Sequence, residues 1–345
     1  MTAPPGRRLL HLAAALDRQS AYDAASYVES ARLAESGGLD FVTLDDGPAR
    51  PGPAALAVLS QVAPATHRVG LVPTVTATHT EPGPVQAAVA ALDRVSRGRA
   101  GWRLGAPAGP AAAEAARPRD GTEPGGTEGG GTEGDGAERD GAGRGAPVAP
   151  WSPQGHLVRV AEATGGHACG TAARHADVVL VNATHPAQAA AVRDRLRDEA
   201  ARSGRDPGAL RVLAGLAIDL RDGEYAAERG GEFPRSEHGR EPGGGGGLRR
   251  TARGPLYRGG PVDLAELIAA WHREGAVDGF HLVPSDPRRD LERLVNGTVT
   301  LLQHRGLFRT FYPGGTLREH LGLARPVDRR TGRSGARRAG AEGAA

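Results

Sequence analysis

The sequence has no lysine, a single cysteine and only two asparagines in 345 residues. A Schiff-base mechanism and a Walker-type phosphate loop both require the lysine ammonium group, so the sequence excludes both. The lone cysteine, Cys169, excludes an intrachain disulfide framework and a zinc site built from thiolates. What remains possible is chemistry carried by hydroxyl, carboxylate, imidazole and guanidinium groups or by a bound cofactor.

Long apolar runs are also missing, and none reaches the 18 residues of a membrane-spanning helix. The run LLHLAAAL at 9–16 follows Arg7 and Arg8 as the apolar part of a signal peptide would. However, it contains His11, ends at Asp17 and has no small-residue cleavage site. We interpret it as a first buried strand and expect a cytoplasmic protein without a membrane partner.

The pI near 9.5 at first suggests a nucleic-acid partner. The tail 326–345 carries five arginines against Asp328 and Glu342, which accounts for the whole formal net charge of +3. The rest of the chain is therefore neutral, and we expect no binding to nucleic acid.

Two stretches are too rich in glycine to bury an apolar core. Residues 105–150 contain 13 glycines, and residues 221–260 contain 12, including five in a row at 243–247. We interpret both as flexible inserts, and 326–345 as a basic flexible tail. The remaining blocks, within a single domain over 1–325, together have about the length of one α/β barrel.

Short apolar runs alternate with longer stretches of helical spacing, a pattern typical of βα units around a parallel sheet. We predict a TIM-type (β/α)8 barrel with both Gly-rich inserts in βα loops at its catalytic mouth. The predicted strands are Leu9–Ala14, Asp40–Leu44, Arg68–Thr76, Ala100–Leu104, Leu157–Glu162, Val178–Asn182, Val212–Asp219 and Gly279–Val283. The predicted helices are 23–36, 54–64, 83–97, 168–176, 186–203, 263–274 and 288–305.

Polar residues lie at or just after the C-terminal ends of these strands, where a barrel keeps its active site. Thr76 and Thr78 lie on one face by alternation, and their hydroxyls could hydrogen-bond a ligand or simply fill strand positions. Asp45 could hold a ligand or cap a helix, and Arg103 needs a partner that an anionic ligand could supply. Gly165 and Gly166 precede a helix and could bring backbone N–H groups to a phosphate. His79 is a candidate proton donor or hydrogen-bond partner near a cofactor, or a solvated loop histidine.

A metal hydrolase is a weaker alternative. His79, His167 and His185 fall in predicted mouth loops, but neither an H-x-H pair nor H-E-x-x-H occurs in the chain. We interpret Cys169 as an inert helical residue, because no base is placed beside it.

Several segments resemble the luciferase-like flavin-dependent monooxygenases, in particular the branch with nitrilotriacetate and dibenzothiophene-sulfone monooxygenases. The longest are LVPTVTATHTEPGPVQAAVAALDRVSRGRAGWR at 71–103 and LVNGTVTLLQHRGLFRTFYPGGTLREHLGLARP at 294–326. GLDFVTLDD at 38–46, AARHADVVLV at 172–181 and SGRDPGALRVLAGL at 203–216 resemble the same proteins in the same order.

The resemblance implies a barrel that takes reduced FMN from a separate NAD(P)H:flavin reductase, activates O₂ and oxygenates a small organic substrate. It places Asp45 and Thr78 near the flavin, and Gly165 and Gly166 in the FMN phosphate loop. No G-x-G-x-x-G lies between a predicted strand and a helix, so we expect no dinucleotide site in this chain. A homodimer is a further expectation.

The sequence departs from the family in that Trp102 is followed by Arg103 where relatives show asparagine, and residues 105–150 replace an active-site segment. A non-catalytic flavin-binding or partner-binding barrel therefore stays open as the alternative, and a deazaflavin-dependent hydride-transfer enzyme is a third possibility.

Overall fold

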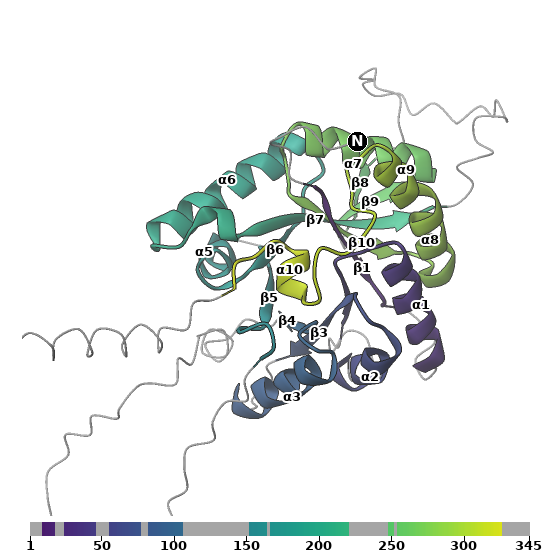
Figure 1. Ribbon diagram of the computed structural model, residues 1–345. Helices are drawn as coiled ribbons and strands as arrows, with labels where there is room; N and C mark the ends of the chain where they lie inside the picture. The colour runs from purple at the N-terminus through teal and green to yellow at the C-terminus, as the bar shows by residue number, and fades with distance from the viewer. Residues whose placement is uncertain are drawn as a thin grey trace, which may run out of the picture.

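Eight parallel strands close into a barrel in the computed structural model (Figure 1). The structure describes residues 9–17, 24–45, 55–76, 82–105, 152–163, 166–220, 248–251 and 254–325. The order is β1 to β7 and then β10, which pairs with both β7 and β1 and so closes the ring. The barrel strands are β1 (His11–Ala15), β2 (Phe41–Leu44), β3 (Gly70–Thr76), β4 (Gly101–Gly105), β5 (Val158–Glu162), β6 (Val178–Val181), β7 (Arg211–Asp219) and β10 (Gly279–Pro284).

These strands confirm the predicted barrel, with boundaries within two residues of those expected from the sequence. The run at 9–16, which resembles a signal peptide, contains β1, and its residues Leu10 and 12–16 are buried. The stretch between strands four and five, for which the sequence predicts no helix, falls at 106–151, outside the described residues.

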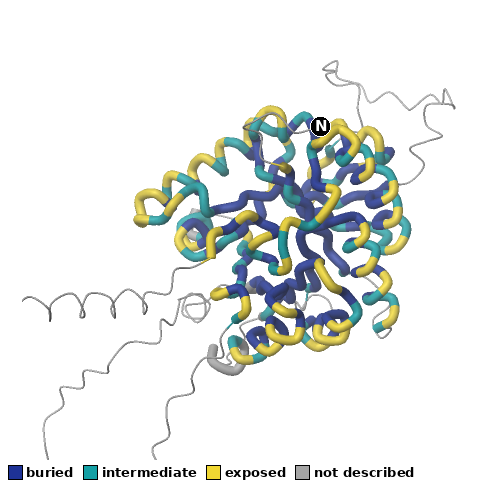
Figure 2. The backbone as a smooth tube through the Cα atoms, in the orientation of Figure 1, coloured by how far each residue is buried: buried dark blue, intermediate teal, exposed yellow. Residues whose placement is uncertain are grey.

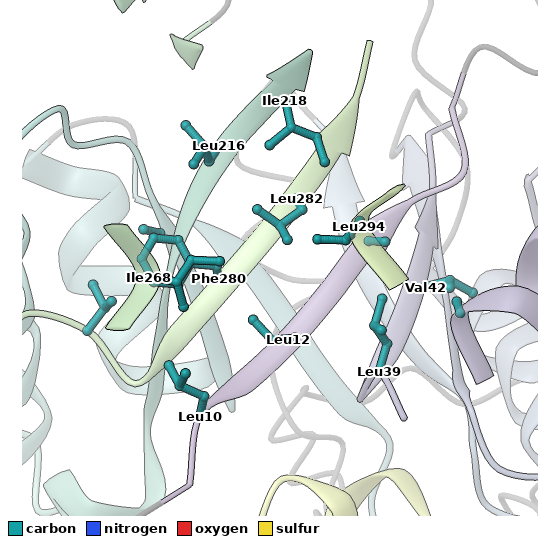
Figure 3. Close-up of a cluster of buried hydrophobic side chains, with 14 of the residues drawn as sticks. Leu10, Leu12, Leu39, Val42, Leu216, Ile218, Ile268, Phe280, Leu282 and Leu294 are labelled. Carbon is teal, nitrogen blue, oxygen red and sulfur yellow. The ribbon is translucent and has the colours of Figure 1, made fainter. Parts of the chain in front are cut away.

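Helices surround the barrel, and Figure 2 shows buried strands in the centre and exposed outer helix faces. Figure 3 shows how Leu12 of β1 and Phe280 and Leu282 of β10 point outward toward Ile268 and Leu294 of the helical layer. The helices are α1 (Ala24–Ser36), α2 (Ala55–Val62), α3 (Pro82–Val95), α5 (Gly166–His175), α6 (Pro186–Arg202), α7 (Pro261–Arg273), α8 (Pro287–Arg293), α9 (Thr300–His304) and α10 (Leu317–His320), with short turns η1 (Ala63–Ala65), η2 (Pro207–Ala209) and η3 (Leu294–Val299).

The predicted helix 288–305 is divided in three, because the π-helical turn η3 separates α8 from α9. Gly297 in this turn lies against Pro261 at the start of α7, and a Cβ atom there would come within 2.6 Å of the proline Cβ. The close approach of the two helices therefore requires glycine at this position.

The C-terminal segment closes the N-terminal end of the barrel. Leu317 and Leu321 pack into a buried cluster with barrel residues such as Val72 and Val158, and α10 begins with a capping box formed by Thr316 and Glu319. A Cβ at Gly70 would lie 2.6 Å from a methyl group of Leu317. Glycine on β3 thus leaves the space that this leucine fills.

Two strands lie in the range 221–260 that we expected to be a flexible insert. β8 (Leu248–Thr251) pairs antiparallel with β9 (Gly254–Arg258), and β9 continues the sheet beside β7 from Ala217 onward. The expectation is wrong for these residues, because fully buried Tyr257 anchors β9 and donates a hydrogen bond to the Gly260 carbonyl. Residues 221–247 lie outside the described part of the chain.

No described helix combines the length and the apolar character needed to cross a bilayer.

Candidate functional site

The predicted site residues fall at the ends of neighbouring strands. Asp45 follows β2, Thr76 is the last residue of β3, Arg103 lies in β4, and Gly166 begins α5 four residues after β5 ends. All four positions belong to the C-terminal end of the barrel. Three further predicted residues, Thr78, His79 and Gly165, lie outside the described residues.

Arg103 connects four strands from inside the barrel. Its side chain is buried; Nε donates to Thr74 Oγ1 at 2.9 Å and Nη1 to Glu162 Oε1 at 3.1 Å. Its Nη2 lies 3.8 Å from Asp45 Oδ1. We expected an anionic ligand to supply the partner of Arg103, but the protein itself supplies two carboxylates. The charge is therefore compensated without a ligand.

The two carboxylates differ from Arg103 in their exposure. The Glu162 side chain is 49% exposed and the Asp45 side chain 29%, whereas the Arg103 side chain is 10% exposed. Both carboxylates therefore retain oxygen atoms that face the solvent side of the site. The arrangement presents acceptors at the surface and holds a cation beneath them.

His281 of β10 lies deeper on the opposite side of the interior. Its Nε2 is 2.9 Å from Thr43 Oγ1 of β2, and its ring stacks on Phe41. Burial, and then the positive charge of Arg103, lowers the pKa of His281 to about 3. The imidazole is therefore neutral at physiological pH, and Arg103 is the cation of this group, which we call the polar layer (Thr43, Asp45, Thr74, Arg103, Glu162 and His281).

Asp45 is also fixed through its backbone. The Asp45 N–H donates to Asp17 Oδ1 at 2.8 Å, which connects the residue after β2 to the end of the segment after β1. Burial, and then the Asp17 charge, raises the pKa of nearby Tyr27 in α1. Asp17 therefore holds the backbone at the edge of the polar layer.

A second cluster of charged residues lies where β6 has ended and β9 pairs with β7 in its place. Asp219, the last residue of β7, accepts from Arg258 of β9 at 3.1 Å and from Arg289 of α8 at 3.2 Å. Fully buried Asp290 accepts from Arg289 and from the Leu220 N–H. These contacts explain how the short β8–β9 hairpin is held at the mouth.

Sequence reasoning missed Thr43, Thr74, Glu162 and His281. Strand alternation was the available signal, because Thr43 lies two residues before Asp45 and Thr74 two residues before Thr76. His281 gave no such signal, since its inward direction depends on the register between β10 and β1, where it pairs with Ala13.

The metal alternative gains no support from the geometry. Among the described residues, no group of three or more histidine, cysteine, aspartate or glutamate side chains could hold a metal ion. His185 precedes α6 as its N-cap residue, and half-buried Cys169 packs against the hydrophobic core of the helical layer.

Comparisons with known proteins agree with this architecture. A family model described as luciferase-like monooxygenase matches residues 9–238. The chain is 47% identical over 68 residues to nitrilotriacetate monooxygenase component A of Aminobacter aminovorans; this match spans 20% of the chain and only 15% of that protein. It is 25% identical to N-acetyl-S-(2-succino)cysteine monooxygenase of Bacillus subtilis over an aligned length of 401 residues, 88% of the chain and 90% of that protein.

Solved structures show the same fold. The chain is similar to EDTA monooxygenase from Chelativorans sp. BNC1, with a TM-score of 0.69 and 19% sequence identity. The similarity covers 92% of this chain and 99% of that one.

Proposed function

Because the chain belongs to the luciferase-like monooxygenase family, we propose that it oxygenates a small organic substrate with O₂ and reduced FMN. The observation that carries the proposal is the extent of the family match, which contains β1 to β7 and every residue of the polar layer except His281. The polar layer lies at the C-terminal end of the barrel, where enzymes with this fold bind their substrates.

The residues of the polar layer fit the polar edge of a flavin. That edge offers carbonyl groups that accept hydrogen bonds and one ring N–H that donates. Buried Arg103 is a donor, and the part-exposed oxygens of Asp45 and Glu162 are acceptors. We infer that these three residues would hold the ring edge, with Thr76 and Thr78 adding hydroxyl groups.

The beginning of α5 would hold the phosphate of FMN. Gly166 is its first residue and Gly165 precedes it, so backbone N–H groups at the helix N-terminus can reach an anion without a side chain intervening. In this arrangement the phosphate contacts depend on the backbone, and the ring contacts depend on Arg103 and its carboxylates.

Neutral His281 would support this site from below. Its imidazole exchanges a hydrogen bond with Thr43 and adds no charge beside Arg103 at neutral pH. His281 is a positioning residue in this account, and His79 remains our candidate for the group that donates a proton or hydrogen bond near the cofactor.

Reduced FMN would supply two electrons and activate O₂, with one oxygen atom transferred to the substrate and the other released as water. The protein would orient the substrate and exclude water from the site. We propose that a separate NAD(P)H:flavin reductase provides the reduced flavin. We further propose that the protein is cytoplasmic and forms a homodimer. Light scattering of the purified chain would test the dimer.

Titration of the purified protein with FMN tests the proposal. We expect reduced FMN to bind, and the protein with reduced FMN to consume O₂ in a substrate-dependent manner. Parallel titration with F420 distinguishes the deazaflavin alternative. Absence of binding by every flavin in both redox states would contradict the proposal and favour a partner-binding barrel.

A further inference from the structure

A cavity lies at the N-terminal end of the barrel, opposite to the polar layer. It has a volume of about 430 Å³ and is bordered by the residues that precede β1, β7 and β10, together with α6 and the C-terminal end of α7. Its position separates it from the proposed flavin site, since the two sites use opposite ends of the same strands.

Arginine dominates the walls of this cavity. Arg193 and Arg197 line it from α6, Arg211 from the start of β7, and His272 from α7. Among the lining residues that the structure describes, Asp278 is the only carboxylate. Asp278 accepts from Arg197 at 3.0 Å and from the Val212 N–H at 2.8 Å. The lining residues therefore include one carboxylate and three guanidinium groups.

Arg193 and Arg197 each have a buried donor without a partner. The Nε atoms of both side chains are buried and make no hydrogen bond to any described residue. Arg193 otherwise donates to the Gly275 carbonyl and lies 3.4 Å from the largely exposed carboxylate of Asp194. Buried donors are nearly always satisfied in folded proteins, so these two arginines are incompletely paired side chains in the wall of one cavity.

The spacing of the two arginines strengthens this argument. Residues 193 and 197 are four apart on α6 and therefore lie on the same face of the helix, where two like charges repel each other. An anion in the cavity would offset these charges and accept hydrogen bonds from the guanidinium groups of both arginines.

We propose that this cavity is a second ligand site, which binds the phosphate or carboxylate group of a small anionic molecule. Arginine suits this role because its planar guanidinium group presents paired donors to both kinds of anion. The cavity borders the first residues of β1 and β7 and the segment that precedes β10. A bound anion would therefore also connect α6 and α7 to the barrel.

Isothermal titration of the full chain with inorganic phosphate, at constant ionic strength set with sodium chloride, tests this site. We expect saturable binding that Arg193→Gln weakens at least tenfold. Arg195→Gln is the matched control, because Arg195 loses the same charge from the same helix but is exposed and does not line the cavity. The control should change the affinity less than twofold, and Arg193→Lys should give an intermediate loss.

Two further arms identify the anion and its place. Succinate in place of phosphate distinguishes a carboxylate ligand from a phosphate ligand, and binding of either in the Arg193-dependent manner supports the site. Saturating FMN should leave the binding intact. The proposal is wrong if neither anion binds, if Arg193→Gln and Arg195→Gln weaken binding equally, or if FMN abolishes the binding. Circular dichroism of each variant verifies that the chain is folded.

Discussion

At the N-terminal end of the barrel, buried Arg99, Arg211 and Arg309 donate to backbone carbonyl groups, whereas Arg103 at the C-terminal end donates to side chains. Arg99 alone bonds the carbonyls of Ala63, Thr66, Val69 and Ser96. Arg211 holds the carbonyls of Leu321 and Gly322 in the closing segment. The three arginines at the N-terminal end donate hydrogen bonds to backbone carbonyl groups, whereas Arg103 holds side chains that remain partly exposed to solvent.

In our proposal, arginine therefore serves stability at one end of the barrel and ligand binding at the other. A carbonyl that accepts from a buried arginine has no role toward a ligand, but the carboxylates beside Arg103 still reach the mouth. Variants at the N-terminal end should therefore change unfolding, and variants in the polar layer should change binding.

The largest effect is expected from Arg309→Met. Arg309 forms a buried ion pair with Asp40, and removal of one partner leaves the other charge uncompensated. We expect the free energy of unfolding to fall by about 3–5 kcal/mol in a urea titration. Arg305→Met is the control, because the Arg305–Glu266 pair is largely exposed and should contribute less than about 1 kcal/mol. Equal losses in the two variants would remove the distinction between buried and exposed pairs.

Two buried histidines, one at each end of the barrel, make the free energy of unfolding depend on pH. Burial lowers the pKa of His281 in the polar layer to about 3 and of His320 in the closing segment to about 4, both below the ordinary value of 6.5. The unfolded chain therefore binds protons that the folded chain does not, and stability falls as pH drops below 6.5. Between pH 7 and pH 5 we expect each histidine to cost about 2 kcal/mol.

Urea titrations at pH 5, 6 and 7 measure this loss. His281→Gln and His320→Gln should each reduce the decrease in stability by the amount assigned to that histidine. Burial alone would raise the pKa of Asp40, but the charges and hydrogen bonds of Arg309 and His11 lower it, so Asp40 titrates below this range. An unchanged pH dependence in both variants would show that neither histidine is held neutral by the fold.

Removal of Arg103 should affect binding more than folding. In Arg103→Gln, the carboxylates of Asp45 and Glu162 lose their cation but stay partly solvated, so we expect stability to change by less than about 1 kcal/mol. The affinity for FMN should fall by about 2 kcal/mol, or roughly thirtyfold, when a charged donor is lost. Arg258→Gln, which replaces an exposed arginine on β9, should leave the affinity within twofold.

The smallest effect is expected from Asp45→Ala. This residue contributes one part-exposed acceptor, so we expect a loss of about 1 kcal/mol in flavin affinity, near fivefold. Its N–H bond to Asp17 is retained, which keeps the backbone in place. Fluorescence titration with FMN measures the change, and an affinity equal to that of the unmodified protein would remove Asp45 from the binding site.

The barrel strands could be predicted because each is a short apolar run between turn residues. The β8–β9 hairpin could not, since its segment LRRTARGPLYR has little apolar content and its position depends on buried Tyr257 and on the ion pair of Arg258 with Asp219. The closing role of residues 317–323 was also missed, because it depends on the space that Gly70 and Gly101 leave inside the barrel.

The site was predictable where a charged residue lies at or near the C-terminal end of a predicted strand. Asp45 follows β2 and Arg103 lies in β4, and the structure brings them within 3.8 Å of each other. Thr43 and His281 lie within their strands, so their meeting depends on the closure of the barrel between distant parts of the sequence. The partners of Arg103 likewise come from three other strands, which no local pattern reveals.

The most direct test of this account is the affinity for reduced FMN, measured anaerobically for the unmodified chain, Arg103→Gln and Arg309→Met under conditions where all are folded. We predict tight binding by the unmodified chain, a loss of roughly thirtyfold in Arg103→Gln, and an affinity within twofold in Arg309→Met. An unmodified chain that binds no flavin, or an Arg103→Gln variant that binds it as well as the unmodified chain does, would contradict the assignment of function to the polar layer.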